Sequence, residues 1–233
     1  MAGMDTDDCL SHPTRREEAT FLRGTRDSYD AIAADYAEMF KAEPEAKPLT
    51  LAMLTAFAQT VAEDGGGPVV EFGSGPGRVT AYLDGLGLDI RGVDLSPAMV
   101  SLARRTYPDL RFDEGSMTDL GGFADGSLRG VVAWYSLIHL PPAEVPGVLA
   151  EFHRVLAPGG HLSLAFQVGE EVSRHTEAFG HVLSLDFHRM RPDRVAEQLR
   201  EAGFEPTATM VRDAEPDERT PQACLTARKP VRA

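Results

Sequence analysis

The middle of the sequence alternates between short apolar runs and segments with helical periodicity. The apolar runs cover residues 68–72, 88–94, 110–116, 128–137 and 161–168. Strands that alternate with helices at this spacing form a parallel sheet with helices on both faces. In such sheets the ligand site lies at the carboxyl ends of the strands, near the point where the strand order reverses. The alternation therefore predicts an α/β domain and the edge at which it binds its ligand.

The sequence after the fifth apolar run departs from this alternation. Residues 169–190 are rich in His and Phe and hold no clean period, so we interpret them as an insertion after the fifth strand. A helical segment over 191–204 and strand-like runs over 205–212 and 221–229 follow. The gap between these two runs is too short for a parallel crossover, which needs a dozen or more residues. We therefore expect a Rossmann-like seven-stranded sheet, mostly parallel, with a C-terminal antiparallel hairpin.

The N-terminal part of the chain predicts a helix before the sheet. One helical face collects five side chains, at Tyr29, Ile32, Ala33, Tyr36 and Phe40. Residues 1–20 contain no apolar core of the kind a signal peptide needs, and we expect them to form a disordered leader. Residues 21–233 are predicted to form a single domain.

The composition limits the partners that such a domain binds. The 233 residues carry a formal net charge of −13, whereas nucleic-acid backbones and anionic membranes attract clustered Lys and Arg. No apolar run reaches the length of about 18 residues that a membrane span needs. Cys9 and Cys224 form no metal-type pair, so we expect a reduced, cytoplasmic protein without a bound metal.

A glycine-rich loop follows the first strand. Gly73, Gly75 and Gly77 permit a tight turn and let a ligand approach the backbone. A phosphate loop of the Walker type needs Gly-Lys-Ser/Thr, which is absent here. A dinucleotide loop needs a fourth glycine at the position of Arg78. A purely structural turn and a loop for S-adenosylmethionine (SAM) are the other interpretations.

The acid at the end of the first strand distinguishes a dinucleotide-binding loop from a SAM-binding loop. Glu71 is expected beside the glycine loop, where its carboxylate would repel a pyrophosphate. SAM carries no phosphate, and its sulfonium and ammonium groups both favour a nearby carboxylate. The alternative is that Glu71 is a solvated acid at a strand end. The pairing of an acid with the glycines favours a cationic ligand without phosphate.

Five segments in chain order carry a family resemblance. They read "VVEFGSGPGR", "GVDLSPAMVSLAR", "DEGSMTDL", "EFHRVLAPGGHLSL" and "AEQLREAGF". Together they resemble class I SAM-dependent methyltransferases of the small-molecule type, like those of ubiquinone and menaquinone biosynthesis. The resemblance extends from about residue 27 to residue 228. It implies SAM as cofactor and S-adenosylhomocysteine as its product.

The resemblance also implies roles for individual residues. Glu71, Gly73 and Gly75 would surround the methionine part of the cofactor. Asp94, 23 positions after Glu71, would hold the ribose, as the spacing itself suggests. Leu95, Ser116 and Met117 would contact the adenine, although the family often has an acid where this chain has Ser116. The N-terminal segment, about residues 21–45, resembles the lid helix of these enzymes, in which Tyr29 and Tyr36 would reach the cofactor or the acceptor.

The candidate residues for catalysis follow the fourth strand. Methyl transfer requires alignment, exclusion of water and removal of one proton, and it requires no metal. His139 is the candidate base because an imidazole titrates near pH ~6.5; the alternative is that it only positions the loop. The candidates for acceptor binding lie here and in the insertion: Tyr135, His175, Phe179, His181 and His188.

The sequence therefore predicts an enzyme that transfers a methyl group from SAM to a small organic acceptor. The accepting atom is oxygen, nitrogen or carbon, in natural-product or quinone-type metabolism. We expect a monomer or a homodimer. Two alternatives remain: an NAD(P)-dependent oxidoreductase, and a SAM-binding protein without turnover, since cofactor motifs report binding and not chemistry.

Overall fold

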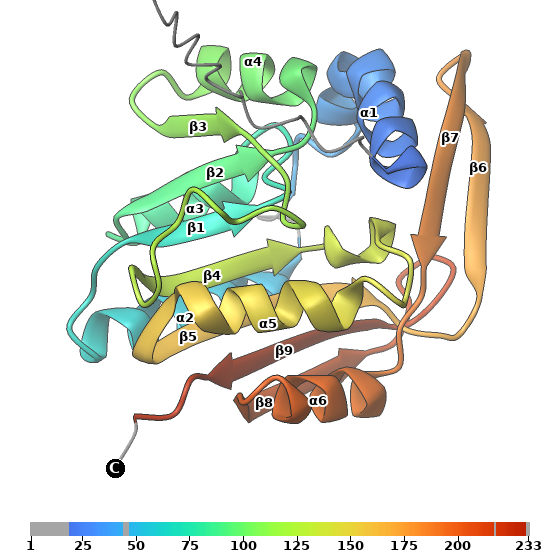
Figure 1. The fold of residues 1–233 in the computed structure, drawn as a ribbon. Coiled ribbons are helices and arrows are strands. Elements are labelled where there is room, and N and C mark those ends of the chain that lie inside the picture. Colours follow the sequence, from blue (N-terminus) through green and yellow to red (C-terminus); the bar gives the residue numbers. More distant parts are fainter. Residues whose placement is uncertain (1–18, 44–46, 217, 232–233) are drawn as a thin grey trace, which may run out of the picture.

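A seven-stranded sheet with the order β3-β2-β1-β4-β5-β9-β8 forms the centre of the protein (Figure 1). The computed structural model describes residues 19–43, 47–216 and 218–231. The expected leader and Cys9 therefore lie almost wholly outside the described residues. The strands of this sheet are β1 (Val69–Phe72), β2 (Ile90–Asp94), β3 (Arg111–Glu114), β4 (Leu128–Trp134), β5 (Leu156–Gln167), β8 (Glu205–Arg212) and β9 (Gln222–Arg228).

The sheet confirms the predicted topology. Strands β1 to β5 run parallel, and β9 pairs antiparallel with both β5 and β8. The order reverses beside β1, whose neighbours are β2 and β4. Strand β5 begins earlier than the sequence suggests, at Leu156, and its register shifts before His161 pairs with Gly130 of β4. The intervening "APGG" is thus an irregularity within the strand that follows the helix.

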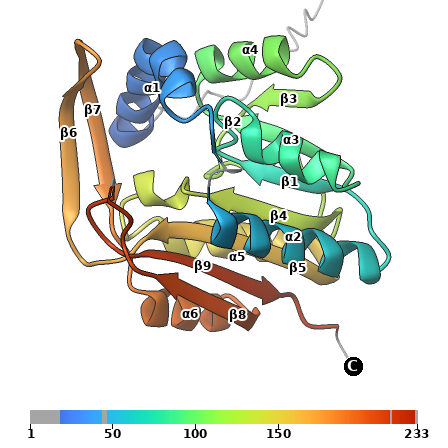
Figure 2. The ribbon, with the colours of Figure 1, turned by 180° about the vertical axis from the view of Figure 1, so that it is seen from behind.

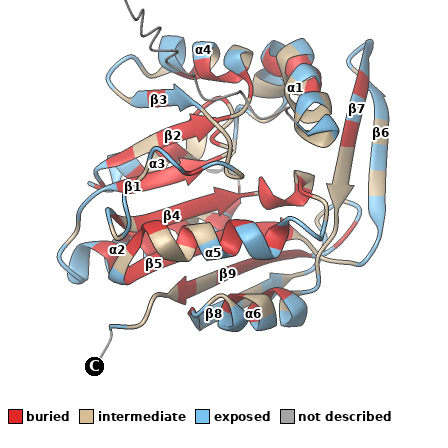
Figure 3. Cartoon of the chain, in the orientation of Figure 1, coloured by how far each residue is buried: buried red, intermediate tan, exposed pale blue. Residues whose placement is uncertain are grey.

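Helices cover both faces of the sheet (Figures 1 and 2). Neighbouring residues of one strand point to opposite faces. Val69 therefore packs with α2 and α3, while Val70 packs with α5 and α6. Buried side chains concentrate on the inner strands and on the helix sides that face them (Figure 3). The helices are α1 (Thr20–Met39), α2 (Pro48–Glu63), α3 (Arg78–Gly85), α4 (Pro97–Thr106), α5 (Val145–Val155) and α6 (Pro192–Glu201), with a short 3-10 helix η1 (Leu137–His139) after β4.

The segment 169–190 forms a hairpin with a register shift between His175 and Glu177, which corrects our interpretation of it as a stretch without a period. Strands β6 (Val172–Ala178) and β7 (His181–His188) pair antiparallel in a second, two-stranded sheet. The two residues of the turn, Phe179 and Gly180, both have positive φ, at 53° and 78°. This is the backbone of a type I′ turn, but Phe-Gly lacks the Asn-Gly or Asp-Gly signal of such turns. The alternation is confined to a short part of β7, and β6 is largely polar.

Helix α1 packs against β7, beyond the carboxyl edge of the main sheet (Figures 1 and 2). The Ser184 amide donates a hydrogen bond of 2.8 Å to the buried hydroxyl of Ser28. A Cβ added to Gly24 would lie 3.1 Å from the Ser184 carbonyl oxygen, so the helix and the strand are in close contact. Ile32, Leu183 and Leu185 form a small apolar cluster between them. We call α1 together with the β6–β7 hairpin the cap.

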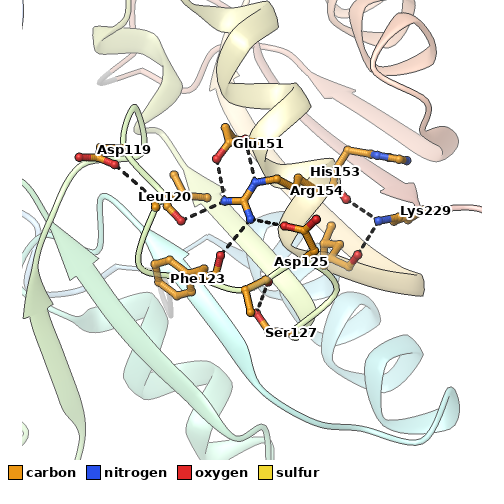
Figure 4. Close-up of polar contacts among 12 residues, drawn as sticks. Asp119, Leu120, Phe123, Asp125, Ser127, Glu151, His153, Arg154 and Lys229 are labelled. Atoms are coloured by element: carbon orange, nitrogen blue, oxygen red, sulfur yellow. Dashed lines mark hydrogen bonds and ion pairs between the residues drawn. The ribbon is translucent and has the colours of Figure 1, made fainter.

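The loop between β3 and β4 is fixed at its far end by one arginine (Figure 4). The guanidinium of Arg154 on α5 donates to the carbonyls of Leu120 and Phe123 and to the carboxylate of Asp125. Glu151, one turn earlier on α5, accepts two further bonds from the same guanidinium. These bonds attach the far end of the loop to α5.

Candidate functional site

A cavity of about 690 Å³ opens at the carboxyl ends of the central strands, beneath the cap. Its floor is formed by the ends of β1, β2 and β4, and α1 and β7 cover it. This is the edge at which the alternation of strands and helices locates a ligand. Among the predicted site residues, those that line the cavity are Tyr29, Tyr36, Glu71, Gly73, Gly75, Asp94, Leu95, Ser116, Met117, Tyr135, His139, His175 and Phe179.

The glycine loop follows β1 and brings the backbone to the cavity. Gly75 has a φ of 53°, and a Cβ placed on it would meet no described atom within 4 Å, so its backbone faces open space. Gly73 has a φ of 75°, and a Cβ there would lie 2.3 Å from the Cβ of Ser136. A side chain at Gly73 is thus excluded by the loop after β4. Gly73 therefore allows close packing against Ser136, and Gly75 allows a ligand to approach the backbone.

Glu71 is a buried acid and not a solvated strand end. Its residue is 2% exposed, and the Thr80 hydroxyl donates a hydrogen bond of 2.5 Å to its Oε2. Burial raises the pKa of Glu71 from 4.5 to about 8, and the nearby Asp94 adds to this increase. The bond from Thr80 and the charge of Arg78 act in the opposite direction. A cationic ligand group would favour the ionised form of this carboxyl.

Asp94 ends β2 on the other side of the glycine loop. Its carboxylate accepts hydrogen bonds from the amides of Gly75 (2.7 Å) and Ser96 (2.8 Å). Burial raises its pKa to about 6, against the effect of these bonds. Ser96 is the N-cap residue of α4, since its hydroxyl accepts a bond from the Met99 amide. The Ser96 hydroxyl also donates to Asp30 of α1, which ties the cap to the second strand.

The loop after β3 supplies the third part of the predicted cofactor site. Ser116 and Met117 line the cavity, and Met117 packs against the main core. The Ser116 hydroxyl lies 2.8 Å from the Thr118 hydroxyl and accepts a bond from the Thr118 amide. The hydroxyl at this position is therefore engaged within its own loop.

His139 joins the end of β4 to both parts of the cap. Its Nδ1 lies 3.2 Å from the carbonyl oxygen of Asp186 on β7, and its Nε2 lies 2.9 Å from the Tyr29 hydroxyl on α1. A carbonyl oxygen only accepts, so Nδ1 carries the proton and the phenol donates to Nε2. Burial lowers the pKa of His139 to about 4, which keeps the imidazole neutral near pH 7.

Aromatic rings surround this pair of residues. The Tyr29 ring meets His139 edge-on at 5.3 Å between centroids, and Phe187 does so at 4.8 Å. Tyr36 lies 5.6 Å from Tyr29, also edge-on. Tyr135 directly follows β4 and has a φ of 53°, a backbone conformation that is rare for a bulky residue and is found at functional sites. Burial raises the pKa of its phenol.

The predicted acceptor residues of the hairpin divide into two pairs. His175 and Phe179 line the cavity, and the His175 ring lies 4.8 Å from Phe187. His181 and His188 do not contribute to the cavity lining. His181 lies at the hairpin tip, half exposed and 3.9 Å from Asp35, and His188 follows Phe187, so it points to the opposite side of β7.

Sequence reasoning missed a charged cluster at the cavity. Arg212 donates to both carboxylate oxygens of Glu218 at 2.5 Å, and Lys47 pairs with Glu215 and, at 3.7 Å, with Glu218. The side chains of Lys47 and Arg212 are only 10% and 9% exposed. No local pattern marks these residues, because Lys47 begins α2 and its partners lie in the β8–β9 loop. Arg78 was recognised only as the residue that replaces a fourth glycine.

Within residues 19–43, 47–216 and 218–231, no group of three or more His, Cys, Asp or Glu side chains is placed to hold a metal ion. In the same ranges, no helix combines the length and the apolar character that crossing a bilayer requires.

Residues 69–160 match the family model described as a methyltransferase domain. Over 93 residues the chain is 34% identical to a demethylmenaquinone methyltransferase of Chlorobaculum parvum, covering 40% of this chain and 37% of that protein. The chain spans less than half the length of the first curated relatives that it matches.

Solved structures share the fold over nearly the whole chain. The Burkholderia thailandensis 1,6-didemethyltoxoflavin-N1-methyltransferase, solved with 1,6-didemethyltoxoflavin and S-adenosylhomocysteine, has a TM-score of 0.68 at 23% identity, covering 94% of both chains. The [4+2]-cyclase SpnF has a TM-score of 0.69 at 18% identity, covering 92% of this chain and 98% of that one. At these identities the likeness shows the fold.

Proposed function

We propose that this chain transfers a methyl group from SAM to a small organic acceptor, since residues 69–160 match a family model for a methyltransferase domain and solved methyltransferases share its fold. The observation that carries this proposal is the juxtaposition of two sites in one cavity. Buried acids flank a glycine loop at one end, and a neutral histidine lies among aromatic rings at the other. The first end suits the donor, and the second suits an acceptor.

The residues of the first end fit SAM better than a dinucleotide. When bound, SAM supplies an electrophilic methyl group on a sulfonium sulfur. Glu71 is buried at the cavity beside the glycine loop, and its carboxyl group would ionise opposite an ammonium, whereas a pyrophosphate would offer it no counter-charge. Asp94 offers its carboxylate to ribose hydroxyls, and Leu95 and Met117 offer apolar surface to the adenine. The oxidoreductase alternative is therefore not favoured.

At the second end we assign the removal of the acceptor proton to Tyr29 and His139 together. The Nε2 lone pair of His139 already accepts the Tyr29 phenol, so an acceptor reaches this base through Tyr29. An acceptor O–H or N–H would give its proton to the Tyr29 oxygen while the phenol proton moves to Nε2. The Asp186 carbonyl holds the Nδ1–H and thereby the tautomer that this transfer needs.

The shape of the second end favours a ring-containing acceptor. Tyr29, Tyr36 and Phe187 present faces and edges to the cavity, which suits stacking with a planar molecule. The relative from Chlorobaculum and the solved neighbour from Burkholderia are named for demethylmenaquinone and didemethyltoxoflavin, both of this kind. We extend the same acceptor class, in quinone-type or natural-product metabolism, to this chain.

A SAM-binding protein without turnover is the second candidate function. Two observations support it: the low pKa of His139 makes it a weak base, and SpnF, named as a [4+2]-cyclase, shares the fold. We also propose a single domain over residues 21–233, a cytoplasmic location and a monomeric or homodimeric state. We propose no nucleic-acid partner. The buried free thiol of Cys224 and the acidic net charge support the location and the partners.

The test measures binding first and turnover second. Calorimetry with SAM, S-adenosylhomocysteine and NADH should show the first two binding and NADH not binding. Incubation with SAM carrying a labelled methyl group and a panel of hydroxylated and aminated aromatic compounds should transfer label to at least one of them. Cofactor binding without label transfer to any acceptor would favour the non-catalytic candidate. Binding of NADH alone would contradict the methyltransferase proposal.

A further inference from the structure

Arg78 is the first residue of α3 and directly follows the glycine loop. Its side chain lines the cavity, and its guanidinium carbon lies 5.7 Å from the ring centroid of Tyr36 and 5.9 Å from that of Phe40. Its Nη1 atom is buried, and no described residue provides a hydrogen-bond acceptor for it. A buried N–H of a charged group without a partner is unfavourable, so the cavity presents a cationic donor that a ligand can satisfy.

Three other cations that line the cavity have protein partners. Lys47 and Arg212 belong to the cluster with Glu215 and Glu218. Arg189 also has a buried nitrogen without a described partner, at Nε, but it forms an ion pair of 2.5 Å with Glu171. Arg78 differs because no described carboxylate forms an ion pair with it and because it belongs to the loop that approaches the cofactor.

Arg78 and Glu71 lie at the two ends of the glycine loop, and a bound ammonium group would favour the ionised form of Glu71, which is opposite in charge to Arg78. They interact electrostatically, since the charge of Arg78 opposes the rise in the pKa of Glu71. Glu71 nevertheless takes its hydrogen bond from Thr80 and not from Arg78. An α-amino acid carries an ammonium and a carboxylate on the same carbon atom. The two side chains are therefore complementary to a zwitterion that lies between them.

We propose that Arg78 binds the α-carboxylate of the methionyl end of the cofactor, while Glu71 binds its α-ammonium group. This inference rests on the proposed function, because it takes SAM as the ligand. A guanidinium suits the position because its flat face stacks on aromatic rings while its edge donates to a carboxylate. The rings on which Arg78 stacks belong to Tyr36 of α1 and to Phe40 just after it.

This arrangement links the cofactor to the cap. A carboxylate that fixes the edge of Arg78 also fixes the face on which Tyr36 and Phe40 rest. Cofactor binding then orders the C-terminal turn of α1 and encloses the acceptor part of the cavity. A ligand without the carboxylate would bind the same nucleoside pocket but would not fix Arg78 against α1.

The test compares ligands that differ at one group. S-adenosylhomocysteine carries both charges, and its decarboxylated form, S-adenosyl-3-thiopropylamine, keeps the ammonium and lacks the carboxylate. Calorimetry with the wild type should show the first binding about 10- to 100-fold more tightly, the effect of a charge-assisted hydrogen bond. Arg78→Met should lose this preference, because S-adenosylhomocysteine weakens and the decarboxylated form does not. Arg78→Lys should recover part of the preference.

Arg91 offers a matched control. Its guanidinium also lies over a ring, 4.9 Å from the centroid of Phe123, but it does not line the cavity. Arg91→Met should leave both affinities unchanged. Hydrogen exchange provides a second readout: S-adenosylhomocysteine should slow exchange in α1 of the wild type, and the decarboxylated form should not.

Three results would overturn the inference. Equal weakening of both ligands by Arg78→Met would show a structural role, and unchanged binding of S-adenosylhomocysteine would show no role. The third, equal affinity of the wild type for the two ligands, would remove the carboxylate contact. If the wild type bound neither ligand, the proposed function itself would fail, and this result is distinct because it needs no variant.

Discussion

The Tyr29 phenol donates a 2.9 Å hydrogen bond to Nε2 of His139, although the two residues lie 110 positions apart. This bond joins the cap to the end of β4. It also places a proton donor, the phenol, directly beside a proton acceptor, the imidazole. It also implies that neither residue performs its role alone, so each variant should lose what the pair provides.

We expect Tyr29→Phe and His139→Gln to lower kcat by similar factors, about 10² or more, because each interrupts the same proton transfer. Because the pair acts as a unit, the double variant should lose little beyond the single ones. Steady-state kinetics with SAM and an unmethylated acceptor that the wild type turns over measures this. Tyr82→Phe is the control, since the Tyr82 hydroxyl bonds to Thr55 outside the cavity. Additive losses would contradict a shared role.

The pH dependence of kcat should reflect the buried state of His139. Burial lowers the pKa of His139 to about 4, so the neutral form persists well below the ordinary value of 6.5. At saturating SAM and acceptor, kcat should stay level from pH 7 down to about 5 and fall only below that. An acid limb centred near pH 6.5 would show that the imidazole is solvated during turnover.

Glu71→Gln should stabilise the free protein while it weakens cofactor binding. The folded protein binds the Glu71 proton more tightly than the unfolded chain does, since its pKa is raised from 4.5 to about 8. The folded state therefore loses stability as the pH rises from 4.5 to 8. Glutamine removes this loss, about 3 kcal/mol at pH 7, and keeps an oxygen for Thr80. Urea unfolding across this pH range measures it.

The control for Glu71→Gln is Glu114→Gln, which changes an exposed acid at the end of β3 in the same sheet. It should alter neither the unfolding free energy nor the affinity for S-adenosylhomocysteine. A Glu71→Gln protein with the pH dependence of the wild type would show that the carboxyl is ionised and stabilised in the free protein.

Ser28→Ala should loosen the cap without affecting the donor site. The substitution leaves the Ser184 amide without its acceptor and should lower the unfolding free energy by about 1–2 kcal/mol. The KM for the acceptor should rise several-fold, while the Kd for S-adenosylhomocysteine should stay unchanged. Thr60→Ala, on the exposed side of α2, is the control. A parallel loss of cofactor affinity would show that the Ser28–Ser184 contact also shapes the donor site.

Glu218→Gln should destabilise the protein by about 3 kcal/mol, because it leaves two largely buried cations, Lys47 and Arg212, short of counter-charge. The bond from Arg212 lowers the pKa of Glu218, so its stabilising contribution is present above the ordinary value of 4.5 and is lost as the pH falls. Thermal unfolding between pH 4 and 7 should show a smaller acid loss for the variant. Glu205→Gln, exposed on β8, should behave like the wild type.

The donor part of the site was predictable because its residues stand at consecutive strand ends. Glu71, Asp94 and Ser116 follow β1, β2 and β3, and parallel strands bring such positions to one edge. The seven-stranded sheet was predictable for the same reason. The apolar runs and the short gap before β9 fix the direction of each strand.

The acceptor part was less predictable because it depends on contacts between distant segments. The β6–β7 hairpin turns at Phe179 without a residue pair that is typical of such turns. The alternation of buried and exposed residues in its strands is also too short to recognise. His181 and His188 are close in sequence to residues that line the cavity, but they do not line it themselves. His181 lies at the hairpin tip, and His188 lies on the other side of β7 because side chains alternate along a strand. The pairing of Lys47 with Glu215 spans 168 positions, and nothing local to either residue indicates it.

The contact between α1 and β7 has a consequence for how acceptor preference changes in proteins of this kind. The hydrogen bond from Ser184 to Ser28 joins segments 156 positions apart, and the shape of Gly24 is matched to the same strand. A chimaera that receives a foreign hairpin alone would combine mismatched surfaces at this seam. The helix and the hairpin should therefore be exchanged together when the acceptor preference of such a protein is changed.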